Sequence, residues 1–173
     1  DGAERLWRDA LALQREIGQR AWQATTVGNL AMIARGHLDL PGAEALYREA
    51  LALHRELGNR PGEALTLFNL AEAARFDGRS DEVESLCRDS LAVSEPLGDR
   101  MLEALCHTYL GELADARGAA AEADAHLSTA VRLADESGAA AAVEAAYSAL
   151  AGHLVRQGRL EEADRALQRL QEP

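Results

Sequence analysis

Apolar and polar residues follow one another along this chain with the period of a helix, and the pattern returns every forty residues. The segment from Leu11 to Arg20 recurs at 51–60, again at 91–100, and more weakly between Val131 and Gly138. Self-similarity at a period of ~20–50 residues is typical of stacked supersecondary units, each packed mainly on its neighbours. The pattern therefore favours an elongated binding surface over a buried catalytic centre.

Each forty-residue unit divides into two amphipathic helices. In the second unit, Leu67, Leu70 and Ala74 recur at helical spacing until Gly78, which can adopt the left-handed conformation that closes a helix. The same reading predicts about nine helices, at 3–17, 21–36, 43–57, 61–76, 81–97, 101–117, 121–137, 141–157 and 160–171. Because the connections between them are short, neighbouring helices are expected to be antiparallel.

Several residues mark the ends of these helices. Pro41 and Pro61 suit a first helical turn, where no amide hydrogen is needed. Ser80 and Asp99 can cap exposed backbone amides. Pro96 lies inside the last turn of its helix, and we expect it to kink or shorten that helix.

Stacking the units aligns residues forty positions apart into columns of large and small side chains. In the first helix of each unit, the columns are Leu30, Leu70, Leu110, Leu150 and Ala31, Ala71, Gly111, Ala151. In the second helix, they are Ala3, Ala43, Val83, Ala123, Ala163; Trp7, Tyr47, Cys87, Leu127, Leu167; and Ala10, Ala50, Ser90, Ala130. Alternating large and small side chains let two helices approach closely, so these columns are the predicted core.

The columns resemble the tetratricopeptide repeat, with its Leu and small residue in the first helix and its Ala, large residue and Ala in the second. The usual repeat has ~34 residues, so this chain is similar to the longer bacterial variety and to the repeats of kinesin light chains. The resemblance implies an all-α fold, an α-solenoid of antiparallel helix pairs in a right-handed superhelix. One array is expected over 1–173, with the second helix of a truncated repeat at 1–18 and repeats at about 19–58, 59–98, 99–138 and 139–173. Leu38, where the turn glycine is expected, departs from the pattern.

Residues 3–17 align with a second helix whose first helix is missing. Leu6, Trp7 and Leu11 are therefore expected on an uncovered face. Since a terminal solenoid unit normally has a polar outer side, we expect either that the chain is a piece of a longer array or that this face packs on another chain. A homo-oligomer formed through this helix is one such arrangement.

Composition narrows the class of partner. A net charge of −11 disfavours both nucleic acid and an anionic membrane as partners. Cys87 and Cys106 lie on apolar helical stripes and are expected to be buried free thiols. No apolar run reaches the ~18 residues of a spanning helix and no secretory signal begins the chain, so a cytoplasmic location is expected, although the chain starts at Asp1.

The resemblance also indicates where a partner would bind. In tetratricopeptide arrays the first helices line a concave groove, and peptide-binding members place Asn there because its amide both donates and accepts hydrogen bonds. Here Asn29 and Asn69 hold matching positions, similar to the kinesin light chain groove. The candidate groove residues are Asn29, Met32, Arg35, Phe68, Asn69, Glu72, Arg75, Phe76, Tyr109 and Glu112.

Two alternatives stay open for these residues. The aromatic side chains can pack on neighbouring repeats instead, which the sequence favours slightly more for Phe76 than for Phe68. Arg35 and Arg75 can grip a carboxylate of a ligand, but pairing with acidic residues of the chain itself is the favoured interpretation.

The sequence gives little support for an enzymatic function. Glu72 and Glu112 are expected on a wet groove wall, where the raised pKa of a catalytic acid is not expected. His107 replaces an apolar member of its column and is interpreted as a hydrogen-bonded core histidine, and no phosphate-binding loop, nucleophile elbow or metal-site motif occurs. We therefore expect no catalytic residue, no metal and no cofactor.

The sequence predicts a protein–protein interaction module that binds a peptide or protein segment in the groove, as part of a larger regulatory protein. The alternatives are a domain that senses a small ligand or signal peptide, and an oligomerisation scaffold.

Overall fold

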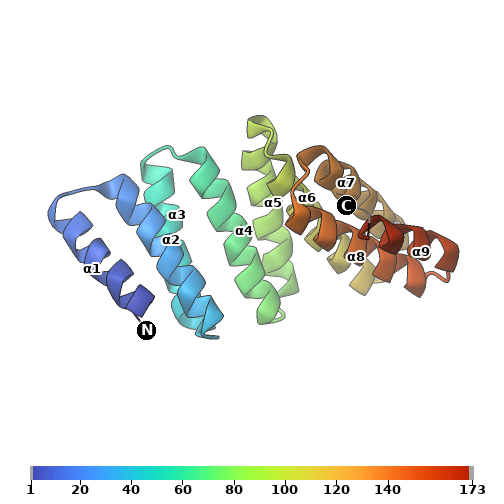
Figure 1. The fold of residues 1–173 in the computed structure, drawn as a ribbon, viewed down its shortest axis with the longest axis horizontal. Coiled ribbons are helices and arrows are strands. Elements are labelled where there is room, and N and C mark those ends of the chain that lie inside the picture. Colours follow the sequence, from blue (N-terminus) through green and yellow to red (C-terminus); the bar gives the residue numbers. More distant parts are fainter. Residues whose placement is uncertain (1, 172–173) are drawn as a thin grey trace. The chain divides into compact units, whose positions relative to one another are not determined.

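The computed structural model describes residues 2–171, which form nine α-helices and one short 3-10 turn. The helices are α1 (Gly2–Glu16), α2 (Arg20–Gly36), α3 (Leu40–Glu56), α4 (Arg60–Phe76), α5 (Ser80–Ser94), α6 (Arg100–Ala116), α7 (Ala120–Ser137), α8 (Ala140–Arg156) and α9 (Leu160–Arg169) (Figure 1). All nine expected helices are present, and the described residues contain no strand.

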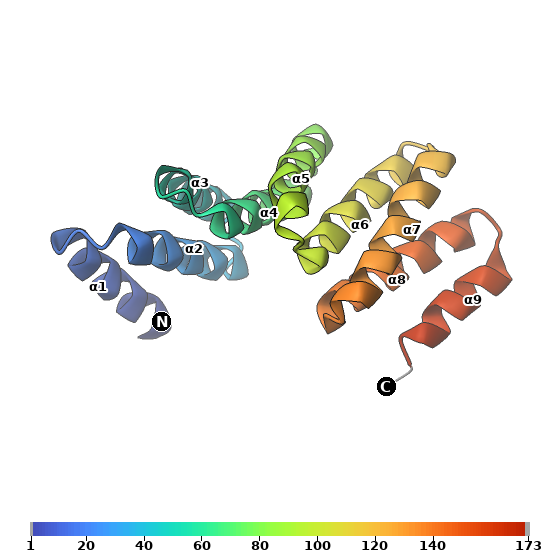
Figure 2. The ribbon, with the colours of Figure 1, turned by 90° about the horizontal axis from the view of Figure 1, so that it is seen from above.

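The chain divides into two compact units, residues 1–86 and 87–173, with the boundary inside α5. In the first unit, α1 to α4 follow one another as antiparallel neighbours (Figure 1). In the second unit, α6 to α9 do the same (Figure 2). The expectation of one continuous array over 1–173 concerns how the units join and stays a prediction.

Packing is tightest between the two helices of one repeat. α2 packs more extensively on α3 than α3 does on α4, and α6 packs more extensively on α7 than α7 does on α8. We call α2, α4, α6 and α8 the first helices and α1, α3, α5, α7 and α9 the second helices. Within each unit, an inner second helix, α3 or α7, thus lies between the first helix of its own repeat and that of the next.

The predicted columns form the core except near the two ends of the chain, where Leu150 is half-buried and Trp7 and Leu167 are 37% and 45% exposed. Leu30, Leu70 and Leu110 are each at most 5% exposed, and Ala31, Ala71 and Ala151 are buried beside them. Side chains of α2 and α3 form one apolar cluster with Leu11, and side chains of α6, α7 and α8 form another. Both cysteines are buried free thiols, as predicted, and contact with Cys106 together with burial raises the pKa of the Cys87 thiol.

Local signals in the sequence account for the helix ends. Pro41 and Pro61 lie in the first turns of α3 and α4, as expected. Asp99 caps α6 by accepting a hydrogen bond from the Leu102 amide at 3.1 Å, while Ser80 is the first residue of α5. Pro96 does shorten its helix, because α5 ends at Ser94 and a 3-10 turn over Glu95–Leu97 completes the segment.

Turns with positive φ recur every twenty residues. Seven of them are glycines, from Gly18 to Gly158, with φ between 64° and 76°. The eighth is Leu38 at φ 62°, the one non-glycine residue with positive φ between residues 2 and 171, and its side chain is 77% exposed. The left-handed conformation brings Cβ close to the following carbonyl oxygen and costs roughly 1–2 kcal/mol in a residue with a side chain. Leu38 therefore holds a strained turn.

Replacing Leu38 with glycine is expected to raise the free energy of unfolding by about 0.5–1 kcal/mol. The strain relieved exceeds the extra entropy that glycine gives the unfolded chain, which is ~0.4–1 kcal/mol. Because the Leu38 side chain is mostly exposed, little packing is lost. Urea denaturation measures the change. The matched control is Leu57→Gly, at a helix end with φ −86°, which should lower stability. A loss of stability in Leu38→Gly would contradict the strain argument.

Candidate binding surface

One face of α4 carries apolar and polar side chains at consecutive helical turns. Leu65, Asn69, Glu72 and Phe76 follow the i, i+4, i+7, i+11 spacing that places residues on one stripe of a helix. Leu65 is 49% exposed and Phe76 is 67% exposed, whereas Asn69 and Glu72 are half-buried between them. The stripe therefore offers two apolar contacts with amide and carboxylate groups between them.

The neighbouring first helix, α2, presents the matching stripe. Asn29 is half-buried and Met32 is 51% exposed, one turn further along. The Arg35 guanidinium donates a hydrogen bond to the Glu72 carboxylate, and this ion pair connects α2 to α4. Each of the two side chains is about one quarter exposed, at 23% and 24%. The predicted preference of Arg35 for an acidic residue of the chain itself is confirmed.

The two phenylalanines are arranged opposite to the expectation. Phe68 is 6% exposed, because it shares its helix face with the buried residues Ala64 and Ala71. It therefore contributes to the core, and its assignment as an exposed groove residue is wrong. Phe76 ends α4, beyond the packed part of the helix, so its ring is exposed.

The remaining residues of the predicted groove are divided between the two units. Arg75 is an exposed residue of α4 in the first unit. Tyr109 and Glu112 lie on α6 in the second unit, and both are half-buried. The first unit therefore holds most of the predicted set. Sequence reasoning missed Leu65, although its position one turn before Asn69, and its apolar character there, are visible in the sequence.

In the second unit, charged groups connect the two first helices. His153 of α8 is fully buried, and its Nδ1 lies 2.5 Å from Oδ1 of Asp115 on α6. Arg156 also donates to the Asp115 carboxylate. Burial alone would raise the pKa of Asp115, but the hydrogen bonds from His153 and Arg156 hold it below its ordinary value. These contacts pair polar groups of α6 and α8, whereas the buried Nε2 of His153 makes no hydrogen bond and lies 3.4 Å from Oδ1 of Asp124.

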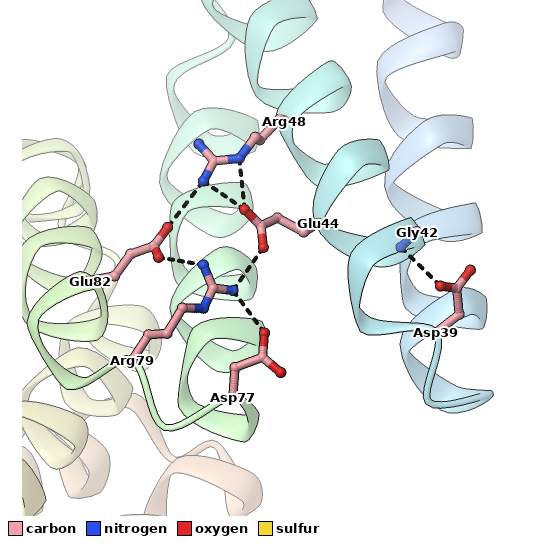
Figure 3. Close-up of polar contacts among 7 residues, drawn as sticks. All are labelled: Asp39, Gly42, Glu44, Arg48, Asp77, Arg79 and Glu82. Carbon is pink, nitrogen blue, oxygen red and sulfur yellow. Dashed lines mark hydrogen bonds and ion pairs between the residues drawn. The ribbon is translucent and has the colours of Figure 1, made fainter.

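A separate ionic network in the first unit joins α3, the start of α5 and the turn before α5, as Figure 3 shows. Arg79 bonds Glu44 at 2.7 Å, Arg48 bonds Glu82 at 3.0 Å, and Arg79 also pairs with Asp77 and Glu82 (Figure 3). Hydrogen bonds from Arg48 and Arg79 lower the pKa of Glu44. Since these charges are matched within the network, we assign it to holding successive repeats in register and not to binding a ligand.

Three of these positions recur with the same pairing eighty residues later. Arg159 bonds both Asp124 and Glu162 at 2.8 Å, in the positions that correspond to Arg79, Glu44 and Glu82. These pairs are exposed enough for solvent to screen them, so each contributes little to stability. Their main effect is to specify which residues face each other.

No group of three or more His, Cys, Asp or Glu side chains among residues 2–171 is arranged to hold a metal ion. Across the same residues, every helix is too short or too polar to span a bilayer.

Comparison with known proteins identifies the repeats. The model of the tetratricopeptide repeat matches residues 24–95, which include most of α2 and all of α3, α4 and α5. Residues 24–95 therefore carry tetratricopeptide repeats. No curated protein matches the chain by sequence.

Solved structures extend the similarity of these tetratricopeptide repeats over nearly the whole chain. BtubC (BKLC) from P. vanneervenii superposes with a TM-score of 0.82 at 19% identity, covering 98% of this chain and 71% of that one. The apo form of RapI gives 0.82 at 16% identity, covering 97% and 47%, so the chain spans about half of its length. TPR-like repeats assigned to a Podosopora anserina kinesin light chain give 0.71 at 18% identity, covering 98% and 84%. At these identities the similarity shows the fold, which is an all-α solenoid of helix pairs as predicted.

Proposed function

We propose that this tetratricopeptide repeat domain binds a peptide or an extended protein segment on the α2–α4 surface of its first unit. The observation that carries the proposal is the stripe of α4, where Leu65 and Phe76 remain 49% and 67% exposed with Asn69 and Glu72 between them. Exposed apolar side chains grouped with a few polar groups are characteristic of interaction sites.

The chemistry of the surface suits a polypeptide. An Asn side chain offers a donor and an acceptor, which matches the amide and carbonyl of a peptide backbone. Asn29 and Asn69 provide this pair of groups on adjacent helices. Met32, Leu65 and Phe76 supply adaptable and aromatic apolar contacts for side chains of the ligand. A small polar metabolite would use the amides but leave these apolar side chains in water.

The charge of the site sets a further preference. Arg35 and Glu72 already neutralise each other, so the surface does not demand a strongly charged ligand, and the net charge of −11 favours a neutral or basic segment. We propose a non-enzymatic role, in the cytoplasm and within a larger regulatory protein.

A peptide selection tests this proposal. A phage-displayed library of 12-residue peptides is selected on residues 1–173, and the affinity of each selected peptide is measured by fluorescence anisotropy. We expect Phe76→Ala and Asn69→Ala each to weaken binding at least tenfold, which is about 1.4 kcal/mol. The control variant is Leu160→Ala, in the second unit, whose side chain is 63% exposed and should leave the affinity unchanged.

The Asn69→Ala and Phe76→Ala variants should retain the circular dichroism of the wild type, because neither side chain is in the core. Peptides that bind the Asn69→Ala and Phe76→Ala variants as tightly as the wild type would place the site elsewhere. A selection that enriches no peptide would argue against peptide binding altogether.

A further inference from the structure

The groove between the second helices α7 and α9 contains an open cavity of about 550 Å³. It is lined by Leu150 and Leu154 of α8, by Asp124 and Ser128 of α7 and by Glu162 of α9. All of these residues lie in the second unit. Because helices of the described chain bound the cavity on both sides, it is distinct from a surface on which a further repeat would stack.

The first unit shows what occupies the equivalent position. There, Nη2 of Arg48 donates to Oε1 of Glu44 at 2.7 Å and to Oε1 of Glu82 at 3.0 Å (Figure 3). A guanidinium therefore lies between a carboxylate of α3 and a carboxylate of α5. Eighty residues after Arg48 the chain has Ser128, whose side chain is too short to make these contacts. The place of the guanidinium is thus open in the second unit.

The two carboxylates, in contrast, are retained. Asp124 corresponds to Glu44 of the first unit. Glu162 corresponds to Glu82, and both second-unit carboxylates bond Arg159 at 2.8 Å. Their side chains are 44% and 43% exposed, against 24% and 31% for the first-unit pair. Oδ2 of Asp124 accepts no hydrogen bond from residues 2–171, so one guanidinium uses acceptors that two guanidiniums share in the first unit.

Apolar surface is exposed in the same cavity. Ala166 of α9 is the equivalent of Leu46, which packs on the apolar cluster that contains Leu30. Because alanine fills less of the groove, Leu150 is half-buried, although Leu30 of the same column is 5% exposed. The cavity thus has an apolar surface beside its carboxylates, which suits a side chain with an aliphatic stem and a cationic end.

We propose that the cavity binds an arginine side chain of a partner polypeptide, whose guanidinium takes the place that Arg48 occupies in the first unit. The guanidinium donates to Asp124 and Glu162, and the aliphatic stem lies against Leu150. A planar fork of N–H donors can bond two carboxylates at once, which the compact ammonium of lysine does less well. The net charge of −11 favours the approach of a basic segment. This site is in the second unit and does not depend on the function proposed for α2 and α4.

Three arginines also line the cavity, so an anionic ligand is the alternative. Arg159 is occupied by the two carboxylates, and Nη2 of Arg169 lies 3.4 Å from Oδ1 of Asp135. Arg165 is exposed. Hydrogen bonds from Arg159, together with the charge of Arg165, lower the pKa of Glu162. An anion would therefore compete with existing interactions of all three arginines, whereas a guanidinium adds to acceptors already in place.

Nuclear magnetic resonance tests the proposal on residues 1–173. The isotope-labelled protein is titrated with Nα-acetyl-arginine N-methylamide, which presents an arginine side chain on a blocked backbone. We expect saturable shifts of the Ser128, Glu162 and Ala166 backbone amides, because these residues line the cavity. The matched probe is the citrulline counterpart, which has a similar shape without the charge. It should bind at least tenfold more weakly, because a neutral donor forms weaker hydrogen bonds with carboxylates.

A variant of the protein locates the bound probe. Ser128→Arg should abolish the shifts, because its own guanidinium fills the place as Arg48 does in the first unit, and it should keep the helical content of the wild type. The control is Ala141→Arg, which adds the same charge at an exposed α8 residue outside the cavity lining and should leave the affinity unchanged. Phe76→Ala should also leave it unchanged, which separates this site from the peptide-binding surface.

Equal affinity for the arginine and citrulline probes, shifts that persist in Ser128→Arg, or no saturable shift at millimolar probe would overturn the proposal. Sodium acetate that shifts the same amides saturably would assign the cavity to an anion instead. Tighter binding of free L-arginine than of the blocked probe would assign it to the amino acid and not to a polypeptide.

Discussion

Replacing Leu70 with alanine is expected to lower the free energy of unfolding by about 2–5 kcal/mol, because the deleted atoms leave a cavity in a packed interior. The Leu70 side chain is 2% exposed and belongs to the column that runs through the first helices. Its neighbour in sequence, Ala71, is 0% exposed, so α4 has little freedom to move into the space. Urea denaturation followed by circular dichroism measures the change.

The control for this prediction lies on the same helix. Leu65→Ala removes the same number of atoms from a side chain that is 49% exposed, so the expected loss is within ~0.5 kcal/mol. The two substitutions also alter helix propensity equally. Equal destabilisation by both would mean that the register of the α4 core is incorrect.

Acidification is expected to destabilise the second unit by up to about 3 kcal/mol between pH 6.5 and pH 4, through His107 alone. Burial, the neighbouring His126 and Arg132 lower the pKa of His107 from 6.5 to about 4. Over this interval the unfolded chain binds the proton and the folded chain does not, so stability falls as the pH falls. Above pH 6.5 both states are neutral and the contribution is complete.

The geometry around His107 opposes protonation of both histidines of the pair. Nδ1 of His107 lies 2.9 Å from Nδ1 of His126, and the ring centroids are 5.1 Å apart. One ring can donate this hydrogen bond only if the other accepts it as a neutral imidazole. Protonating both rings would place two donors, both positively charged, against each other between α6 and α7.

A variant isolates the histidine from other acid effects. His107→Leu places an apolar side chain in a column whose equivalent residue, Leu67, is 2% exposed. The free energy of unfolding of the wild type minus that of His107→Leu should increase as the pH rises from 4 to 6.5 and then level off. Parallel curves for wild type and His107→Leu would contradict the prediction.

The sequence by itself determined the helices, their turns and most of the core. The forty-residue period places Leu30, Leu70 and Leu110 at equivalent positions of successive first helices. An apolar column of this kind is expected to be buried, and it is. Pro96 shortened its helix as expected, because a missing amide and a fixed φ act locally, whatever the surroundings. The uncovered α1 face was likewise predictable from register, although Leu11 is buried against α2.

Tertiary structure decided which residues outside the repeated columns are exposed and which side chains pair across helices. Phe68 and Phe76 are the same residue type on one helix, yet one is 6% and the other 67% exposed, because exposure depends on where neighbouring helices end. The pairing of Arg35 with Glu72, and of His107 with His126, joins residues 37 and 19 positions apart that meet only after the helices stack. Periodicity specifies which face of a helix is buried, whereas side-chain partners across helices depend on distances that the packed structure alone establishes.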